Sequence, residues 1–538
     1  MDLNIGDHPD RLNLLKMTPM KADSKFKNKK LDFYSVFAQP LGSPEFINGV
    51  SEEYHSARPY EHGVLDGLIS ENFLRKVRQE ILENLAFSER ETDIYKVFQT
   101  GDLENLSGLA LDERNKLTSL IKLRDALYSN EFRCFISKVT GCGCLSGKVI
   151  DMSVNIYGQG GHLLNHDDVI GTREVSFILY LVDPDEPWLP SYGGALRLYP
   201  TPRPFFPDSG HEKAIFPLWN QFCFFQVQPG RSFHDVQEVY QENKWRLSIS
   251  GWFHRPQPGE EGWEESKKCN QNEFSSLQFL HSDIQDYDEP RMVPSICSIA
   301  FNDEFNEFPK DHLAYLKDWI NPEYLNHEKM VQLRETFLDH SVLELPDFLE
   351  STLSDHVKSW ILAAERSSST QTLLNVSPPW KLAKPLHKHR YLYIDSPDSS
   401  DSPLTSLLRN LFNHPSFHQW IHFCTTLTPS TFSTLIRRFR PGLDYTLAIP
   451  HASSSPILDL ILCLTPSGRW DHGQNGGYHL YMTPATPIHS ILFNSNPSWN
   501  TFHFILRDYG VLHFIKYLSL HSQASRWDIL SHFYFTTS

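Results

Sequence analysis

Two histidines and one aspartate are the residues whose types and spacing are best suited to chemistry. His166 and Asp168 lie two positions apart, so in an extended segment both side chains face the same way and contact one metal ion. His234, in the strand-like segment 232–235, supplies a third ligand. Two histidines and one carboxylate leave the other coordination positions of a metal open, which suits non-haem Fe(II) oxygenases. We therefore predict an iron site at His166, Asp168 and His234.

A His-x-Asp pair alone is commonly a solvated turn, so the prediction depends on the next strand. There Arg246, Ser248 and Ser250 alternate with Leu247 and Ile249, which gives the strand a polar and an apolar face. In a half-covered antiparallel strand the polar face meets water. Alternatively, Arg246 points into a barrel, where its buried guanidinium needs a carboxylate partner. A dicarboxylate such as 2-oxoglutarate would chelate the iron with one end and pair with Arg246 at the other.

Two tyrosines lie on neighbouring strands of the same region. Tyr157 precedes the His-x-Asp pair, and Tyr180 shares a strand face with Ser176 and Ile178. Phenolic hydroxyls donate hydrogen bonds to carboxylates, so both tyrosines are candidates for holding the same co-substrate. Taken singly, each is equally suited to a hydrophobic core.

These residues lie in a region with the pattern of strands. From residue 149 onward, short apolar runs rich in β-branched and aromatic residues alternate with Gly, Pro and Asp clusters, which predicts an antiparallel barrel or sandwich. Upstream, Phe73, Val77, Ile81 and Leu85 recur with helical spacing and predict an amphipathic helix over 70–85. The expected fold is mostly β with flanking helices, an α+β class.

The chain contains an internal repeat with an offset near 280 residues. Short matches recur in the same order in both halves, which indicates two tandem copies of one β-rich domain. The matching segments are 62–66 with 340–344, 175–181 with 457–463, 193–194 with 476–477, 219–222 with 499–502 and 245–249 with 527–531.

The repeat predicts that the second copy is catalytically inactive. His166, Asp168, His234 and Arg246 align with Ala448, Pro450, Phe514 and Asp528, respectively. The first three replacements offer no metal ligand, and an aspartate would repel the carboxylate that Arg246 attracts. His513 falls one residue from the ligand position, so we expect it on the opposite face of its strand.

Composition excludes several classes of protein. The chain has 538 residues, of which 40% are apolar and 13% aromatic, as expected for two or three folded domains. Its net charge of −16 disfavours nucleic-acid coating, so we expect no direct DNA binding. No apolar run reaches the roughly 18 residues of a membrane span, so we expect no membrane association.

The cysteine content and the charge of the N-terminal residues indicate the cellular compartment. Eight cysteines are too sparse for a disulfide framework, which favours reduced thiols in cytosol or nucleus. Residues 1–30 carry seven Lys/Arg, four of them lysines between Lys25 and Lys30, which predicts a disordered basic tail. Such a tail is either a nuclear localisation signal or a solvated terminus. We expect the nucleus and the cytoplasm.

The motifs together resemble a known family. In chain order they are Tyr157, His166-x-Asp168, Tyr180, Gly193-Gly194, His234 and Arg246-x-Ser248, with 93–99 upstream and 251–254 closing the series. The series resembles the 2-oxoglutarate- and Fe(II)-dependent prolyl hydroxylases that modify a ribosomal protein. It is most similar to fungal prolyl 3,4-dihydroxylases of the termination-and-polyadenylation type, and animal ribosomal prolyl 3-hydroxylases are relatives. The resemblance covers about residues 50–538.

The resemblance implies tandem double-stranded β-helix domains of the jelly-roll or cupin-like kind. It implies Fe(II) at His166, Asp168 and His234, 2-oxoglutarate at Arg246, Ser248, Tyr180 and Tyr157, O2 as oxidant, and ascorbate as reductant. The expected domains are a tail at 1–45, a catalytic domain at 46–256, a linker at 257–275 and a degenerate copy at 276–538.

The implied substrate is a prolyl residue of the small-subunit ribosomal protein at the decoding centre. The implied reaction hydroxylates this residue at C3, with or without a second hydroxylation at C4. It would affect the accuracy of translation termination, with termination factors or mRNP proteins as further partners. Two alternatives stay open. One is an oxygen-sensing regulatory protein whose C-terminal domain controls the stability of a transcription factor; the other is a purely structural double barrel.

Overall fold

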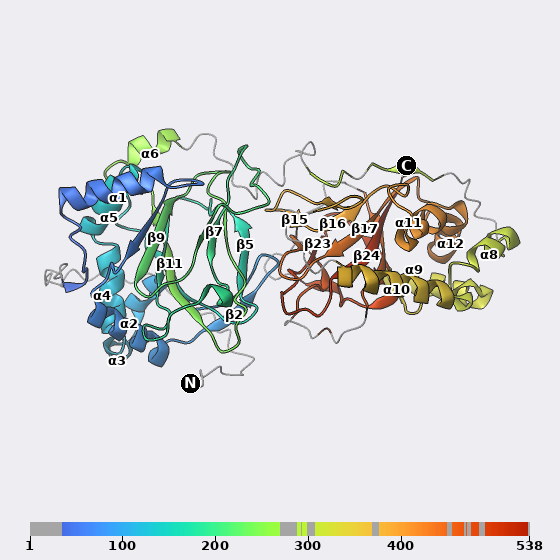
Figure 1. Cartoon of the computed structure of the whole chain (residues 1–538), viewed down its shortest axis with the longest axis horizontal. Coiled ribbons are helices and arrows are strands. Elements are labelled where there is room, and N and C mark those ends of the chain that lie inside the picture. Colours follow the sequence, from blue (N-terminus) through green and yellow to red (C-terminus); the bar gives the residue numbers. More distant parts are fainter. Residues whose placement is uncertain are drawn as a thin grey trace.

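The two halves of the chain form two β-rich domains that lie side by side (Figure 1). The computed structural model describes residues 35–269, 288–291, 293–297, 307–367, 376–448, 455–466, 470, 475–483 and 490–535. The predicted basic tail lies mostly outside these ranges. Within them, no helix has both the length and the apolar character needed to cross a membrane.

The first domain combines helices with a large antiparallel sheet. Its helices are α1 (Pro44–Ser56), α2 (Glu71–Asn84), α3 (Leu111–Asn115), α4 (Thr118–Leu127), α5 (Asn130–Thr140) and α6 (Trp263–Cys269), with 3-10 turns at Leu103–Gly108 and Pro190–Tyr192. Its strands are β1 (His62–Asp66), β2 (Ser88–Glu91), β3 (Tyr95–Gln99), β4 (Asp151–Tyr157), β5 (His162–His166), β6 (Arg173–Tyr180), β7 (Leu196–Leu198), β8 (Lys213–Ile215), β9 (Gln221–Gln226), β10 (His234–Val236) and β11 (Arg246–His254).

The second domain has the same kinds of elements. Its helices are α8 (Lys310–Leu316), α9 (His327–His340), α10 (Ser351–Ser367), α11 (Pro403–Leu407) and α12 (Pro415–Thr425), with short turns at Pro322–Leu325 and Leu408–Phe412. Its strands are β12 (Ser295–Ile296), β13 (Val342–Leu345), β14 (Lys381–Leu382), β15 (His389–Arg390), β16 (Leu392–Ile394), β17 (Thr431–Phe439), β18 (Tyr445–Thr446), β19 (Ile457–Leu464), β20 (His479–Met482), β21 (Ile491–Ser495), β22 (Trp499–Arg507), β23 (Leu512–Ile515) and β24 (Arg526–Tyr534).

The sheet of the first domain runs in the order β1-β9-β6-β11-β4-β3-β5-β10-β7-β8, with β2 beside β3, and curls into a double-stranded β-helix. Strand alternation gives it two different faces. Leu247 and Ile249 pack into the core shared with α1, α2, α4 and α5, whereas Arg246 and Ser248 point the other way and are also buried. The polar face of this strand therefore lies inside the barrel and not in water.

The second domain repeats this topology. The strand order β13-β22-β19-β24-β17 reproduces β1-β9-β6-β11-β4 of the first domain. Asn220 and Asn500 hold equivalent corners: both have positive φ, and their side-chain oxygens accept hydrogen bonds from the backbone N–H of Ile69 and Leu349, at 3.0 and 2.8 Å. The predicted tandem duplication is confirmed.

Two predicted boundaries differ from the structure. Val36, Phe37 and Leu41 are buried in the core of the first domain, so the folded chain begins before residue 46. In the predicted linker, the Glu260 carboxylate accepts hydrogen bonds from Ser146 Oγ at 2.6 Å and from the Gly147 N–H at 2.8 Å. Because of these bonds, the part of the linker before residue 270 is attached to the first domain; residues 270–275 lie outside the described ranges.

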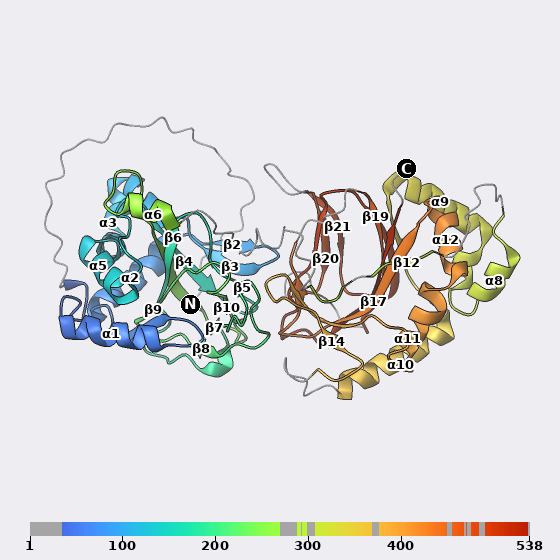
Figure 2. The ribbon, with the colours of Figure 1, turned by 90° about the horizontal axis from the view of Figure 1, so that it is seen from above.

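The predicted helix over 70–85 corresponds to α2, with Leu74, Val77 and Ile81 buried. Ser70 precedes it, but its hydroxyl donates to Ser35 instead of capping the helix. Seen from above, the helices lie on the outer sides of both domains, and strands β2, β3 and β5 of the first domain face the second (Figure 2). The predicted iron ligands on β5 and β10 therefore lie on the side of the first barrel nearest its copy.

Candidate active site

The three predicted iron ligands come together inside the first barrel. His166 ends β5 and pairs directly across the sheet with His234, the first residue of β10, which places their rings 4.3 Å apart. Asp168 follows with φ of 61°, a left-handed conformation that directs its carboxylate back toward the histidines. Its oxygens lie 3.1 Å from His166 Nε2 and 3.4 Å from His234 Nε2. The ligand atoms all lie within 4.8 Å of one another, as one metal ion requires.

The backbone prepares both histidines for metal binding. His166 Nδ1 faces the Leu164 carbonyl at 2.8 Å, and His234 Nδ1 faces the Ser232 carbonyl at 2.9 Å. In the tautomer that these carbonyls favour, each Nδ1 carries a proton, and each Nε2 can give its lone pair to a metal ion that replaces its proton. Burial alone would raise the pKa of Asp168, but the two imidazoles hold it well below its usual range, so the carboxylate is ionised.

Two further donors orient Asp168, and sequence reasoning did not identify either. Ser176 Oγ and Trp252 Nε1 donate to Asp168 Oδ2, at 2.9 and 3.0 Å. Ser176 lies on the same strand face as Tyr180, and Trp252 continues the face of Arg246 and Ser248. The alternation of these strands was the available signal, because it marks every second residue as facing the interior.

Arg246 is 1% exposed and holds a fixed position. Its Nε donates to the Gly194 carbonyl at 2.7 Å, and its terminal nitrogens contact Tyr180 Oη at 3.2 Å and Ser248 Oγ at 3.5 Å. Among the described residues no carboxylate lies within ion-pair distance of it. A buried guanidinium is stable only with a partner, so this arrangement fits an anionic ligand.

The other co-substrate candidates lie around Arg246. Tyr157 lines the cavity, and its ring lies 5.0 Å from the Arg246 guanidinium carbon. Burial raises the pKa of Tyr157 to about 12, so its hydroxyl keeps its proton. Tyr180 and Ser248 contact Arg246 but are absent from the cavity wall. Their contacts position the Arg246 guanidinium, and their direct contact with a co-substrate stays a prediction.

The iron ligands and Arg246 line one cavity of about 320 Å³. Asn165, Gln99 and Asn155 add polar groups to its wall, and none of them was predicted from the sequence. Two lining residues, His387 and Leu447, come from the second domain. The arrangement can hold a metal ion, an anion and part of a third molecule next to one another.

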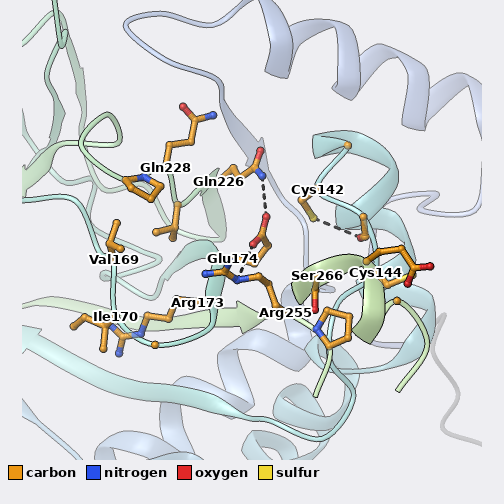
Figure 3. A pocket seen from close by; sticks show the side chains of 18 of the residues that line it. Cys142, Cys144, Val169, Ile170, Arg173, Glu174, Gln226, Gln228, Arg255 and Ser266 are labelled. Carbon is orange, nitrogen blue, oxygen red and sulfur yellow. Dashed lines mark hydrogen bonds and ion pairs between the residues drawn. The ribbon is translucent and has the colours of Figure 1, made fainter. Parts of the chain in front are cut away.

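A second, larger cavity of about 850 Å³ adjoins the first, and Val169, Ile170 and Arg173 line both. On its wall Glu174 accepts a hydrogen bond from Gln226 at 2.8 Å and lies 3.5 Å from Arg255 Nε. Figure 3 shows Glu174 between these two residues, with Cys142 and Cys144 across the cavity. Within the described ranges, the only group of side chains with metal-ligand spacing is the one in the first cavity.

The second barrel corrects the predicted alignment at His513. On β23 this residue pairs with Tyr481 of β20, as His234 of β10 pairs with Leu198 of β7. His513, and not Phe514, therefore occupies the position of His234. The connecting loops differ in length between the copies, so one constant offset displaces this strand by a residue. Of the residues aligned with His166 and Asp168, Ala448 lies within the described ranges and Pro450 lies outside them.

The alignment of Asp528 with Arg246 was also wrong. Arg526 is the first residue of β24, as Arg246 is of β11, and it donates to the carbonyl of Gly477 as Arg246 does to that of Gly194. Asp528 takes the position of Ser248, and its carboxylate accepts from both Arg526 and Arg437. Within the described part of this barrel, no group of His, Cys, Asp and Glu side chains has metal-ligand spacing. The inactivity of this copy stays a prediction.

Comparison with known proteins also indicates an iron-dependent oxygenase. Residues 152–254 match the model described as 2OG-Fe(II) oxygenase superfamily, and residues 311–538 match the model described as oxoglutarate and iron-dependent oxygenase degradation C-term. Prolyl 3,4-dihydroxylase OGFOD1 of Ostreococcus tauri is 35% identical over 90% of this chain and 97% of its own. Prolyl 3-hydroxylase OGFOD1 of Xenopus laevis is 32% identical over 60% of this chain and 52% of its own length. Prolyl 3-hydroxylase OGFOD1 of Mus musculus is 34% identical over 54% of this chain and 44% of its own length.

The fold and the matched region define a 2-oxoglutarate- and Fe(II)-dependent oxygenase. Within that class the chain belongs to the family of OGFOD1-type prolyl hydroxylases, so the predicted family and activity are confirmed. Fe(II), 2-oxoglutarate and O2 are the cofactors and co-substrates of this family. The two histidines and one carboxylate of the first barrel are a donor set that fits Fe(II).

Proposed function

We propose that this prolyl hydroxylase binds Fe(II) through His166, Asp168 and His234 and the distal carboxylate of 2-oxoglutarate through Arg246. The observation that carries the proposal is the buried Arg246 guanidinium, which has no carboxylate partner among the described residues. In the second barrel the equivalent guanidinium, Arg526, contacts the carboxylate of Asp528, which Arg437 also contacts. The first barrel thus has a charge that a ligand must balance.

The chain's own groups bind and orient the reactants. Bound Fe(II) with 2-oxoglutarate and O2 supplies the oxidising chemistry, and the protein supplies position and exclusion of water. Ser176 and Trp252 hold the Asp168 carboxylate toward the two histidines. Tyr180 and Ser248 fix the Arg246 fork, and the protonated hydroxyl of Tyr157 can donate to a carboxylate beside it.

We infer that the substrate is a prolyl residue of the small-subunit ribosomal protein at the decoding centre, hydroxylated at C3 with or without C4. The similarity to proteins named prolyl 3,4-dihydroxylase and prolyl 3-hydroxylase supports the reaction. Ascorbate would keep the iron reduced. The expected consequence is a change in the accuracy of translation termination, with termination factors or mRNP proteins as partners in cytoplasm and nucleus.

The test is a mass-spectrometric comparison of small-subunit ribosomal proteins incubated with and without the purified chain, Fe(II), 2-oxoglutarate and ascorbate. We expect one prolyl peptide to gain one or two oxygen atoms, and the number gives the stoichiometry directly. If no ribosomal prolyl peptide gains oxygen while another protein's does, the substrate proposal is wrong and the enzyme class stands.

A second function is favoured by one observation. The model that matches residues 311–538 is described as a degradation C-term, which supports an oxygen-sensing protein whose second domain controls the stability of a transcription factor. A variant that loses such control and still hydroxylates its substrate at the wild-type rate would separate this function from the first.

A further inference from the structure

The cavity that holds the candidate iron site is built by both domains. Most of its wall belongs to the first barrel, but His387 and Leu447 belong to the second. His387 lies between the buried Leu386 and β15, and Leu447 directly follows β18. The second domain therefore forms part of the surface that a bound reactant contacts.

Specific contacts fix the second domain in this position. The Glu238 carboxylate is 1% exposed and accepts hydrogen bonds from the Leu520 N–H at 2.9 Å, Tyr517 Oη at 3.3 Å and the Ser519 hydroxyl. The Ala448 N–H, next to Leu447, donates to Asp93 at 2.9 Å.

Aromatic and apolar side chains support the same placement. The ring of His387 packs 5.1 Å from that of Phe233, the neighbour of His234. Leu164, next to the β5 residues of the site, packs with Tyr445, Leu447 and Tyr517. Packed apolar groups hold fixed positions, so the contribution of the second domain to the cavity is a stable feature of the fold.

Two lining side chains have polar atoms without partners. His387 and Asn165 are each 2% exposed, and neither ring nitrogen of His387 nor either amide atom of Asn165 has a hydrogen-bond partner in the described parts of the chain. Buried polar groups in native proteins are nearly always paired, so each exception requires an explanation. A reactant bound in the cavity that both residues line provides one.

The chemistry of these groups selects the reactant. Burial lowers the pKa of His387 to about 3, so its imidazole is neutral and offers one donor and one acceptor. The Asn165 amide likewise offers both. An anion such as 2-oxoglutarate needs donors and positive charge, whereas the main chain of a peptide offers alternating N–H and C=O groups. A neutral pair with mixed polarity therefore fits a peptide main chain best.

We propose that His387 of the second domain and Asn165 of the first hydrogen-bond the main chain of the substrate beside the target prolyl residue, so the second domain completes the substrate site. This inference rests on prolyl hydroxylation but not on the ribosomal substrate. His387 acts as a positioning residue: it orients the peptide and makes no contact with iron or 2-oxoglutarate.

The test uses the full-length chain and a degenerate peptide library with one central proline, because main-chain recognition does not depend on the neighbouring side chains. His387→Phe keeps a ring against Phe233 and removes both nitrogens. Loss of a hydrogen bond to the substrate should raise the peptide KM about tenfold, with the KM for 2-oxoglutarate changed less than about twofold. His387→Gln restores a donor and an acceptor and should recover most of the affinity.

A matched control is His521→Gln, a second-domain histidine whose Nε2 bonds the Tyr240 carbonyl at the interface without lining the cavity. It should leave the peptide KM unchanged. Binding of the library to the Fe(II)-free protein, measured by calorimetry, should follow the same order as the KM values. An unchanged peptide KM in His387→Phe, or equal losses in the Phe and Gln variants, overturns the inference. Absence of ribosomal hydroxylation with normal library turnover would instead overturn only the proposed substrate.

Discussion

In the second domain the Nε of Arg526 donates to the carboxylate of Asp528 at 3.0 Å, and both side chains are buried. The first domain has the same arginine, Arg246, but Ser248 stands where the aspartate would be. The second copy therefore gives its buried arginine a carboxylate partner from its own chain, whereas the first copy offers Arg246 none among the described residues.

Replacing Arg246 tests this relationship. Arg246→Gln keeps a polar side chain and removes the charge, so it should raise the KM for 2-oxoglutarate. Hydrogen bonds to charged groups contribute about 1.5–3 kcal/mol, which corresponds to roughly a 10- to 150-fold rise. The measurement is succinate formation as a function of 2-oxoglutarate at saturating peptide. Iron content should not change, because Arg246 is not one of the candidate ligands.

The matched control is Arg526→Gln in the second barrel. This change removes one hydrogen bond from a charged donor to Asp528, which keeps its contact with Arg437, and such a bond contributes about 1.5–3 kcal/mol of folding free energy. We expect lower thermal stability with an unchanged 2-oxoglutarate KM. An equal rise in that KM for both variants would show that the effect is not local to Arg246.

Removing one candidate iron ligand should abolish both metal binding and turnover. His166→Ala leaves two ligands, and the barrel keeps its own hydrophobic core, so the far-ultraviolet circular dichroism should stay close to that of the wild type. Iron content after gel filtration and peptide-dependent succinate formation are the measurements. His55→Ala, which changes a histidine with 46% of its side chain exposed, is the control. Wild-type hydroxylation by His166→Ala would refute the metal assignment.

The residues that orient Asp168 should tune metal affinity without removing it. Ser176→Ala and Trp252→Phe each delete one donor to Asp168 Oδ2, and partners of metal ligands typically contribute about 10- to 100-fold in affinity. We expect activity to need a correspondingly higher Fe(II) concentration and to return to near the wild-type rate at saturation. A lowered rate at saturating Fe(II) with unchanged affinity would assign these residues a different role.

The sequence predicted the parts of the site that depend on local spacing. Arg246 and Ser248 alternate with apolar neighbours, so strand geometry places them on an interior face. The spacing of His166 and Asp168 predicted that they meet, but Asp168 lies beyond the end of β5, and its left-handed conformation turns it toward His166. The place of His387 in the cavity wall could not be predicted in this way. Its position in the cavity depends on how two complete domains dock, and no local pattern near residue 387 carries that information.

The repeat shows the limit of alignment by a constant offset. The corner asparagines Asn220 and Asn500 match at the offset that relates the two copies, but the loops before β20 and β23 differ in length from those in the first domain. A shift of one residue reverses the face of a strand side chain. His513 was therefore assigned to the wrong face, although its strand was correctly identified.

The interior of the second barrel should make its stability depend on acid pH. Asp459 is buried, and its carboxylate contacts Arg507 at 3.0 Å and His532 at 2.7 Å. Burial alone would raise the pKa of Asp459, but Arg507 and His532 hold it well below its ordinary value. A carboxyl whose pKa is lower in the folded chain than in the unfolded chain stabilises the fold above the unfolded pKa of about 3.9. That contribution is lost as the pH falls from about 5 toward the folded pKa.

Asp459→Asn should therefore destabilise the second domain by about 3–5 kcal/mol at pH 7, because Arg507 loses its buried partner. Urea unfolding at pH 7 and at pH 3.5, with separate transitions fitted for the two domains, measures the difference between wild type and variant. We expect that difference to shrink at the lower pH. Asp185→Asn, which alters an exposed ion pair with Arg75, should leave the unfolding of the second domain unchanged at both values. A gap that stays constant between the two pH values would mean that the Asp459 carboxyl has the same pKa in the folded and unfolded chain.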